Sequence, residues 1–133
     1  MYDDDDPFLA RLRAIALQLP DAAEKVSHGR PAFFTSKVFA YYGASVKVDG
    51  EWVQHPRCVI VLLDPGERQA VLAEQRTFVP AYLGPSGWIG VDLVADGIGK
   101  VGDVDWDEVA ELLDGSYRMT AGARRVAALE GGG

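Results

Sequence analysis

The fold class follows from residues 37–63, which read KVFAYYGASVKVDGEWVQHPRCVIVLL. Asp49 and Gly50 stand between two β-rich arms, and Asp-Gly favours a type I′ hairpin turn because both central residues need positive φ. Pro56 is expected to close the second arm, since proline interrupts a ladder of strand hydrogen bonds. The most apolar run of the chain, residues 57–63, follows and predicts a central strand covered on both faces. This segment therefore predicts an antiparallel sheet.

Helices are expected on both sides of this segment along the chain. The first is predicted over residues 7–19, because Asp6 can cap it, Pro7 suits its first turn, and apolar side chains recur at helical spacing. Further helices are predicted over residues 65–75 and 106–118, since each begins with the spacing of a capping box.

Shorter elements complete the expected order. Residues 21–30 predict a helical turn and then a loop, and residues 31–34 begin extended. Strands are predicted at residues 78–83 and 88–94, on either side of the turn sequence GPSG. The Ala- and Gly-rich residues 119–133 are expected to be a flexible, fraying tail.

One fold class fits this order of helix, three or four strands, helix, two strands and helix. It is an α+β two-layer sandwich, with an antiparallel sheet of about five strands and helices packed on one face. We expect residues 1–133 to form a single domain, with an acidic run over residues 1–6 and a Gly-rich loop over residues 95–104.

The composition is that of an ordinary globular protein, with 133 residues, 48% hydrophobic and 25% charged. One Cys and two His argue against a disulfide framework and the usual zinc sites. Cys58 lies in the apolar run, so we expect a buried, inert thiol. No apolar run is long enough to cross a membrane and the N-terminus is acidic, which predicts a cytoplasmic protein with no membrane partner. The absence of Asn and the excess of Arg over Lys are typical of a GC-rich bacterial genome.

The formal net charge of −7 is unevenly distributed along the chain. Residues 3–6 are all Asp and lie where they can stabilise the positive end of the first helix. Residues 7–58 carry seven basic and four acidic side chains, whereas residues 59–133 carry six basic and twelve acidic ones. The overall charge counts against a generic nucleic-acid coat, but the mildly basic middle leaves a local anionic partner open.

Catalytic motifs are absent from the sequence. Ser27 and His28 are neighbours, so their side chains diverge, and no nucleophile elbow, phosphate-binding loop or HExxH pattern occurs. The acidic residues between Asp103 and Glu111 fit a solvated, capped helix better than a cation site. We therefore expect no enzymatic activity, no cofactor and no metal.

Candidate binding residues combine cations with aromatic rings. His28 and Arg30 lie in a polar loop, Tyr82 and Trp88 flank the GPSG turn, and Arg118 ends the last predicted helix. Aromatic rings beside cations suit a planar anionic or nucleotide-like partner. The full candidate set is His28, Arg30, Lys37, Tyr82, Trp88 and Arg118. The alternative is that these residues pack, cap helices and bond to loop carbonyls.

Six short blocks of sequence are more specific in combination than singly. They are residues 27–33 (SHGRPAF), 37–40 (KVFA), 78–85 (FVPAYLGP), 87–92 (GWIGVD), 105–106 (DW) and 116–118 (SYR). Together they resemble the MmcQ/YjbR family over most of residues 8–118. The resemblance implies a compact two-layer fold described as CyaY-like or secretion-chaperone-like. Members of the family are commonly described as DNA-binding because of a winged shape, so the resemblance also implies DNA binding. It implies no catalytic residues.

This chain departs from the family pattern in its Asp run, its acidic last helix, its Gly-rich residues 95–104 and Gly115. The first two departures disfavour non-specific affinity for DNA, because phosphate binding needs an excess of Lys and Arg.

Two functions remain open from the sequence. The first, slightly favoured by the resemblance, is a non-enzymatic DNA-binding module with the Asp49-Gly50 hairpin as a wing. Its phosphate contacts would come from Arg30, Lys37, Lys47 and Arg57. The second is a module that binds a small ligand or a protein partner through the aromatic and basic patch. A chaperone-like role has only the fold analogy behind it. One contiguous positive face would favour the first function, and a mixed surface with an aromatic-lined pocket would favour the second.

Overall fold

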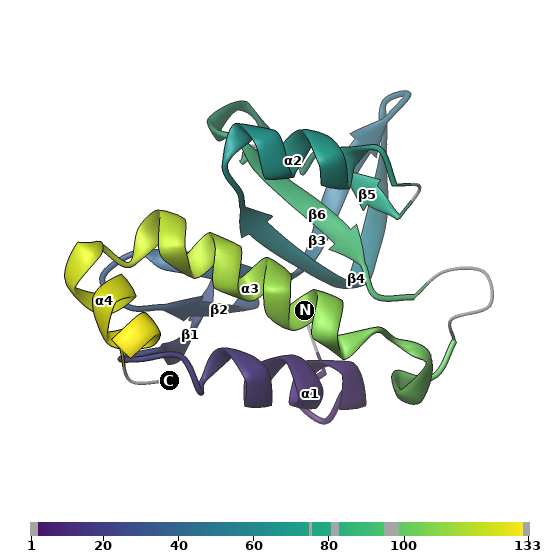
Figure 1. The fold of residues 1–133 in the computed structure, drawn as a ribbon. Helices are drawn as coiled ribbons and strands as arrows, with labels where there is room; N and C mark the ends of the chain where they lie inside the picture. The colour runs from purple at the N-terminus through teal and green to yellow at the C-terminus, as the bar shows by residue number, and fades with distance from the viewer. Residues whose placement is uncertain (1–2, 75, 81–82, 95–98, 132–133) are drawn as a thin grey trace.

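A computed structural model describes residues 3–74, 76–80, 83–94 and 99–131. Within these residues, six strands form one antiparallel sheet in the order β1-β2-β3-β4-β6-β5 (Figure 1). The strands are β1 (Ala23–Ser27), β2 (Arg30–Phe34), β3 (Val38–Val48), β4 (Glu51–Leu62), β5 (Thr77–Phe78) and β6 (Trp88–Asp92). The predicted α+β class is confirmed, with one strand more than expected.

The helices form the second layer. They are α1 (Pro7–Ala16), α2 (Pro65–Leu72), α3 (Trp106–Thr120) and α4 (Ala123–Gly131), with short 3₁₀ turns η1 (Gly84–Ser86) and η2 (Val101–Asp103). Figure 1 shows α3 crossing the sheet with α1 beside it, and α3 packs directly on β3 and β4. In the described part of the chain, no helix is both long and apolar enough to pass through a bilayer.

Strand β4 divides its side chains between two clusters on opposite faces of the sheet. Val59 and Val61 belong to the main core, which they share with the inward faces of α1 and α3. Cys58 and Ile60 alternate with them and therefore point to the other face, where they join Ala44 in a small second cluster. These four β4 side chains are at most 4% exposed, so the prediction of a central strand covered on both faces is confirmed.

Helix α1 begins where it was predicted, and its cap has a second role. The Asp6 carboxylate accepts a hydrogen bond of 2.9 Å from the Phe8 N–H. Asp6 is only 7% exposed, and its other oxygen accepts a 2.6 Å hydrogen bond from the Tyr42 hydroxyl, with Arg57 Nε at 3.4 Å. Burial, followed by the hydrogen bond to Asp6, raises the pKa of the Tyr42 phenol. Asp6 therefore ties the start of α1 to the sheet, a role that the exposed Asp3 and Asp5 do not share.

The starts of the next two predicted helices are also confirmed. Asp64 accepts hydrogen bonds from Gly66 N–H at 2.9 Å and Glu67 N–H at 3.1 Å, at the start of α2. Asp105 accepts one from Glu108 N–H at 3.1 Å, at the start of α3.

The prediction of a helical turn and loop over residues 21–30 is wrong. Strand β1 lies there and pairs with β2 through a tight turn at His28 and Gly29, whose φ angles are 53° and 78°. The predicted Asp49-Gly50 turn is confirmed and has the same backbone, with φ of 50° and 84°. β1 is a short edge strand with mostly exposed side chains, so it has no alternating apolar signal. The partner strand, rather than local propensity, decides its conformation.

Pro56 was expected to close an arm, but β4 continues through it as a strand of 12 residues. The β3–β4 pairing shifts register between Tyr42 and Ala44, so that Gly43 faces the segment around Pro56. A proline is tolerated at an irregularity because its missing N–H removes no regular ladder bond there.

Several element ends differ from the prediction. α1 ends at Ala16 and α2 at Leu72, earlier than expected. Of the described part of the strand predicted at residues 78–83, Phe78 lies in β5, and residues 79, 80 and 83 lie outside any strand. Residues 123–131, expected as part of a fraying tail, form α4. Ala-rich segments have a high helix propensity. α4 is also held by ion pairs of 3.0 Å from Arg125 to Asp21 and from Arg118 to Glu130. Tyr82 and the first four residues of the Gly-rich loop, 95–98, lie outside the described residues.

Replacing the buried cap is expected to destabilise the protein more than replacing its neighbour. Asp6→Ala removes the helix cap and leaves the Tyr42 hydroxyl without its acceptor, which should lower the free energy of unfolding by about 2–3 kcal/mol. The control Asp5→Ala changes an exposed side chain and should stay within about 0.5 kcal/mol. Urea denaturation of both variants measures this difference. Equal effects of the two substitutions would contradict the anchoring role of Asp6.

Candidate functional site

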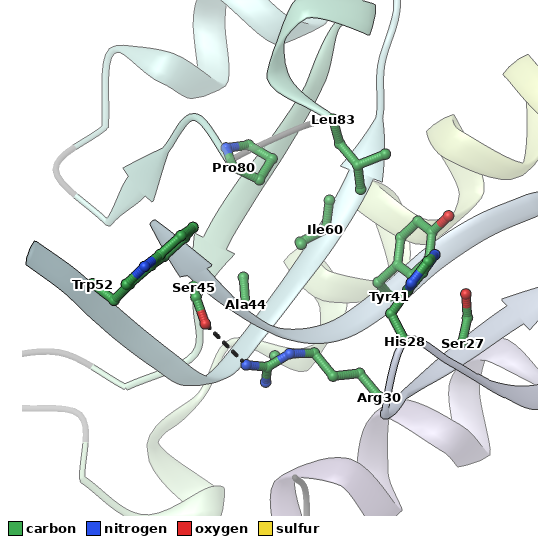
Figure 2. Close-up of a pocket in the computed structure, with 11 residues that line it drawn as sticks. Ser27, His28, Arg30, Tyr41, Ala44, Ser45, Trp52, Ile60, Pro80 and Leu83 are labelled. Atoms are coloured by element: carbon green, nitrogen blue, oxygen red, sulfur yellow. Dashed lines mark hydrogen bonds between the residues drawn. The ribbon is translucent and has the colours of Figure 1, made fainter. Parts of the chain in front are cut away.

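A pocket of about 670 Å³ opens on the sheet face opposite α3 (Figure 2). Its floor is formed by Ala44 and Ile60, which point away from the main core. Trp52 lies at one end of the pocket, and Tyr41 and His28 lie at the other. The volume falls in the range of about 300–1,000 Å³ that is common for small-molecule sites.

The two aromatic walls are held differently. The Tyr41 ring packs edge-on against Trp88, with centroids 5.5 Å apart and planes at 65°, so Trp88 supports the wall from outside the pocket. Trp52 is 51% exposed, and Lys47 Nζ lies 5.9 Å from the centre of its ring. Much of the Trp52 indole is therefore open to contact with a ligand.

Arg30 is the main polar feature of the pocket. Figure 2 shows its side chain extending along one side toward Ser45. Its Nη2 donates hydrogen bonds to Ser45 Oγ at 3.2 Å and to Gln54 Oε1 at 3.3 Å, and Ser45 Oγ donates to the same Gln54 oxygen at 2.9 Å. These neutral groups orient the guanidinium without neutralising it.

No carboxylate in the described ranges forms an ion pair with Arg30. Other arginines behave differently: Arg13, for example, pairs with Glu24 at 2.6 Å and with Asp4 at 2.8 Å. A guanidinium stays protonated at any physiological pH. Arg30 therefore presents a full positive charge beside apolar walls.

Gly43 makes the position of Arg30 possible. Its φ is 81°, in the left-handed region that glycine adopts without strain. A Cβ on this residue would lie 2.5 Å from Arg30 Nη1, which is closer than such atoms can approach. The glycine thus adopts the backbone at the register shift without strain and leaves the space that the Arg30 side chain occupies.

The structure brings together some of the predicted binding residues and separates others. His28 and Arg30 line the same pocket, and Trp88 supports its Tyr41 wall. Lys37 lies in the turn between β2 and β3, at the opposite end of β2 from Arg30. Arg118 lies on α3, where it pairs with Asp114 at 2.9 Å and with Glu130. Arg118 was predicted to join the patch, but it belongs to the helical layer.

The two further residues proposed for phosphate contacts have different surroundings. Lys47 is exposed near the tip of the β3–β4 hairpin, beside Trp52. Arg57 contacts Asp6, and its guanidinium lies 4.4 Å from the centre of the Phe8 ring at the start of α1. Arg57 therefore holds a helix to the sheet.

Sequence reasoning missed most of the pocket lining. Tyr41, Ser45, Trp52 and Ile60 come from the two arms of the predicted hairpin but were not connected with His28 and Arg30. One signal was available, because an isolated Gly within a strand pattern often marks a bulge or a close approach of another group. Gly43 fits that description.

A second polar pair was also missed. His55 Nδ1 lies 2.9 Å from an Asp92 oxygen, and its ring stacks on Phe78 with centroids 3.9 Å apart. This contact joins β4, β5 and β6. Among the residues that the structure describes, no group of three or more His, Cys, Asp or Glu could hold a metal ion.

The comparisons with known proteins give one family. A family model described as YjbR matches residues 17–119 of the chain. This range contains every residue named above as part of the pocket wall or floor. No curated protein sequence matches the chain.

Adding a methyl group at Gly43 is expected to cost more than adding one at another glycine with the same backbone. Gly50 has a φ of 84°, with nothing within 4 Å of its added Cβ. Gly50→Ala should therefore show backbone strain alone, about 1 kcal/mol. Gly43→Ala should cost about 0.5–1 kcal/mol more, because the methyl group also displaces the end of the Arg30 side chain from its hydrogen bonds to Ser45 and Gln54. Chemical denaturation gives both values, and equal losses would contradict the close approach of Arg30.

The thiol of Cys58 is expected to be unreactive in the native protein. Burial, followed by the nearby Asp92 carboxylate, raises the pKa of this thiol above its usual range, so very little thiolate is present at about pH 8. A thiol-specific disulfide reagent should label native protein at least about a hundredfold more slowly than protein in denaturant. Equal labelling rates in the two conditions would show that Cys58 is accessible.

Proposed function

The chain belongs to the YjbR family, and we propose that it is a non-enzymatic binding protein whose sheet-face pocket takes a small organic anion. The proposal chooses the second of the two functions that the sequence left open. The observation that carries it is the charge of Arg30, which faces a mostly apolar pocket and has no carboxylate partner within the described residues.

The physical reason lies in the cost of partial desolvation. A cation beside apolar walls loses part of its hydration, and an incoming anion restores the lost interaction through charge-assisted hydrogen bonds. Ser45 and Gln54 already hold the guanidinium in place, so an anion meets an oriented donor. Pre-organisation of this kind lowers the side-chain entropy that Arg30 loses when a ligand binds.

The apolar lining of the pocket favours a ligand with an apolar body. Tyr41, Ile60 and Leu83 supply aromatic and aliphatic contacts around the Arg30 charge. Mostly apolar linings with a few placed polar groups are typical of sites for small organic molecules. An inorganic anion alone would leave these surfaces uncovered.

DNA binding stays a prediction with weaker support. Arg30 and Lys37 lie at opposite ends of β2, and Arg57 is engaged by Asp6. Of the four phosphate-contact candidates, Lys47 near the hairpin tip has the surroundings that a wing requires. Phosphate contacts add up only when several cations face the same backbone.

A thermal-shift screen with a matched pair of variants tests the proposal. Small organic anions are expected to raise the Tm of the wild-type protein by several degrees at saturation, whereas amines and neutral analogues should not. Arg30→Gln should abolish the shift because it removes the charge, and Arg118→Gln, a cation on the helical layer, should retain it. A screen without stabilising anions, or equal shifts in the two variants, would overturn the proposal.

A duplex titration at low salt separates the two functions. The small-anion proposal predicts no DNA binding that depends on Lys37, Lys47 and Arg57. Binding that weakens steeply with salt, with a log–log slope of about −0.9 per phosphate contacted, would support the DNA hypothesis instead.

A further inference from the structure

We infer that the ligand of this pocket is an aromatic monocarboxylate, with its ring against Trp52 and its carboxylate on Arg30. This inference rests on the proposed function and names the class of anion. It is carried by the charge of the pocket, by the arrangement of its aromatic walls and by the small side chains of its floor.

The charge of the pocket matches a single negative charge. Arg30 is the permanent cation among the described lining residues, and no carboxylate lies among them. A carboxylate carries one negative charge and is well bound by one guanidinium, whereas a phosphate monoester carries about 1.5–2 at neutral pH. A phosphate would therefore enter with charge that Arg30 alone does not balance. The hydroxyls of Ser27 and Ser45, and the imidazole of His28 in its neutral form, add hydrogen-bonding capacity but no charge.

The walls suit a flat ring. Figure 2 shows the Trp52 and Tyr41 rings on opposite sides of the space above Ala44 and Ile60. Trp52 is the nearer ring to the cation, because it lies two residues from Gln54, a hydrogen-bond partner of Arg30. An aromatic ligand gains edge or offset contacts with this indole beyond the simple burial of apolar area. Trp52 is 51% exposed, so about half of its surface is accessible for this contact.

The floor leaves room next to the charge. The Arg30 guanidinium lies over Gly43, and the next residue on β3, Ala44, has only a methyl group on the pocket floor. A planar group can therefore lie close to the strand backbone while its acid group meets Arg30. Larger side chains at these two positions would separate the ring site from the cation.

Calorimetric titration of the full chain with four matched probes tests the inference. Naphthoate is the aromatic monocarboxylate, naphthamide its neutral analogue, cyclohexanecarboxylate an acid without an aromatic ring, and naphthyl phosphate a ring with a more highly charged anion. Naphthoate is expected to bind at least about tenfold more tightly than naphthamide and cyclohexanecarboxylate, because each of these lacks one of the two interactions. Naphthyl phosphate is expected to bind no more tightly than naphthoate.

Variants assign the two interactions to residues. Arg30→Gln should reduce naphthoate affinity to the level of naphthamide, and Arg30→Lys should restore part of it by retaining the charge without the planar donor. Trp52→Leu should weaken naphthoate and naphthamide alike. Val48→Ala, an exposed change on the same hairpin that does not line the pocket, should leave all affinities unchanged. Thermal melts of each variant confirm that it is folded.

The outcomes separate this inference from the proposed function. If naphthyl phosphate binds at least tenfold more tightly than naphthoate, or cyclohexanecarboxylate binds equally well, and this binding depends on Arg30, the aromatic-acid inference is wrong while the anion-binding proposal stands. If none of the probes binds, or binding is unchanged in Arg30→Gln, both are overturned. Binding of naphthoate that depends on Arg30 and Trp52 supports both.

Discussion

The passage of Arg30 over Gly43 is the contact on which the rest of the pocket depends. A residue with a Cβ at position 43 would strain the backbone and collide with the guanidinium. The same glycine lies at the register shift that admits Pro56 into β4 and re-aims the long hairpin carrying Trp52. The register shift of the hairpin and the position of the cation therefore coincide at one residue without a side chain.

The pocket and the core share a strand. Val59 and Val61 pack under α3, while Ile60, between them, lies on the pocket floor. Side chains in cores are closely packed and hold their positions, so the floor inherits the rigidity of the core behind it. Asp6 also holds α1 against the sheet, because it contacts Tyr42 of β3 and Arg57 of β4. A site built on paired strands is positioned more precisely than one built on loops alone.

Much of the fold could be predicted from local signals, whereas the site could not. Asp6, the Asp49-Gly50 turn and the apolar β4 run act through neighbours in sequence, and the structure confirms all three. The His28-Gly29 turn has positive φ angles like those of the Asp49-Gly50 turn, but His stands where Asn or Asp is usual, so the sequence did not predict it. The pocket depends on which distant residues the register brings together, and no spacing along the chain predicts that Trp52 and Arg30 line one pocket. The excess of basic side chains in residues 7–58 likewise did not predict on which face of the sheet they lie. Arg57 contacts Asp6 at the start of α1, whereas Arg30 lines the pocket.

Ser116 links the helical layer to the sheet through the backbone. This buried hydroxyl on α3 accepts a hydrogen bond from the Leu62 N–H at 2.8 Å and donates one to the Phe39 carbonyl, so a helical side chain bridges β3 and β4. An amide bonded to a helix opens when the layers separate, whereas an amide bonded to a strand opens when the strands part. In hydrogen-exchange terms, the Leu62 amide is therefore a natural reporter of α3 lifting from the sheet, distinct from the fraying of the hairpins.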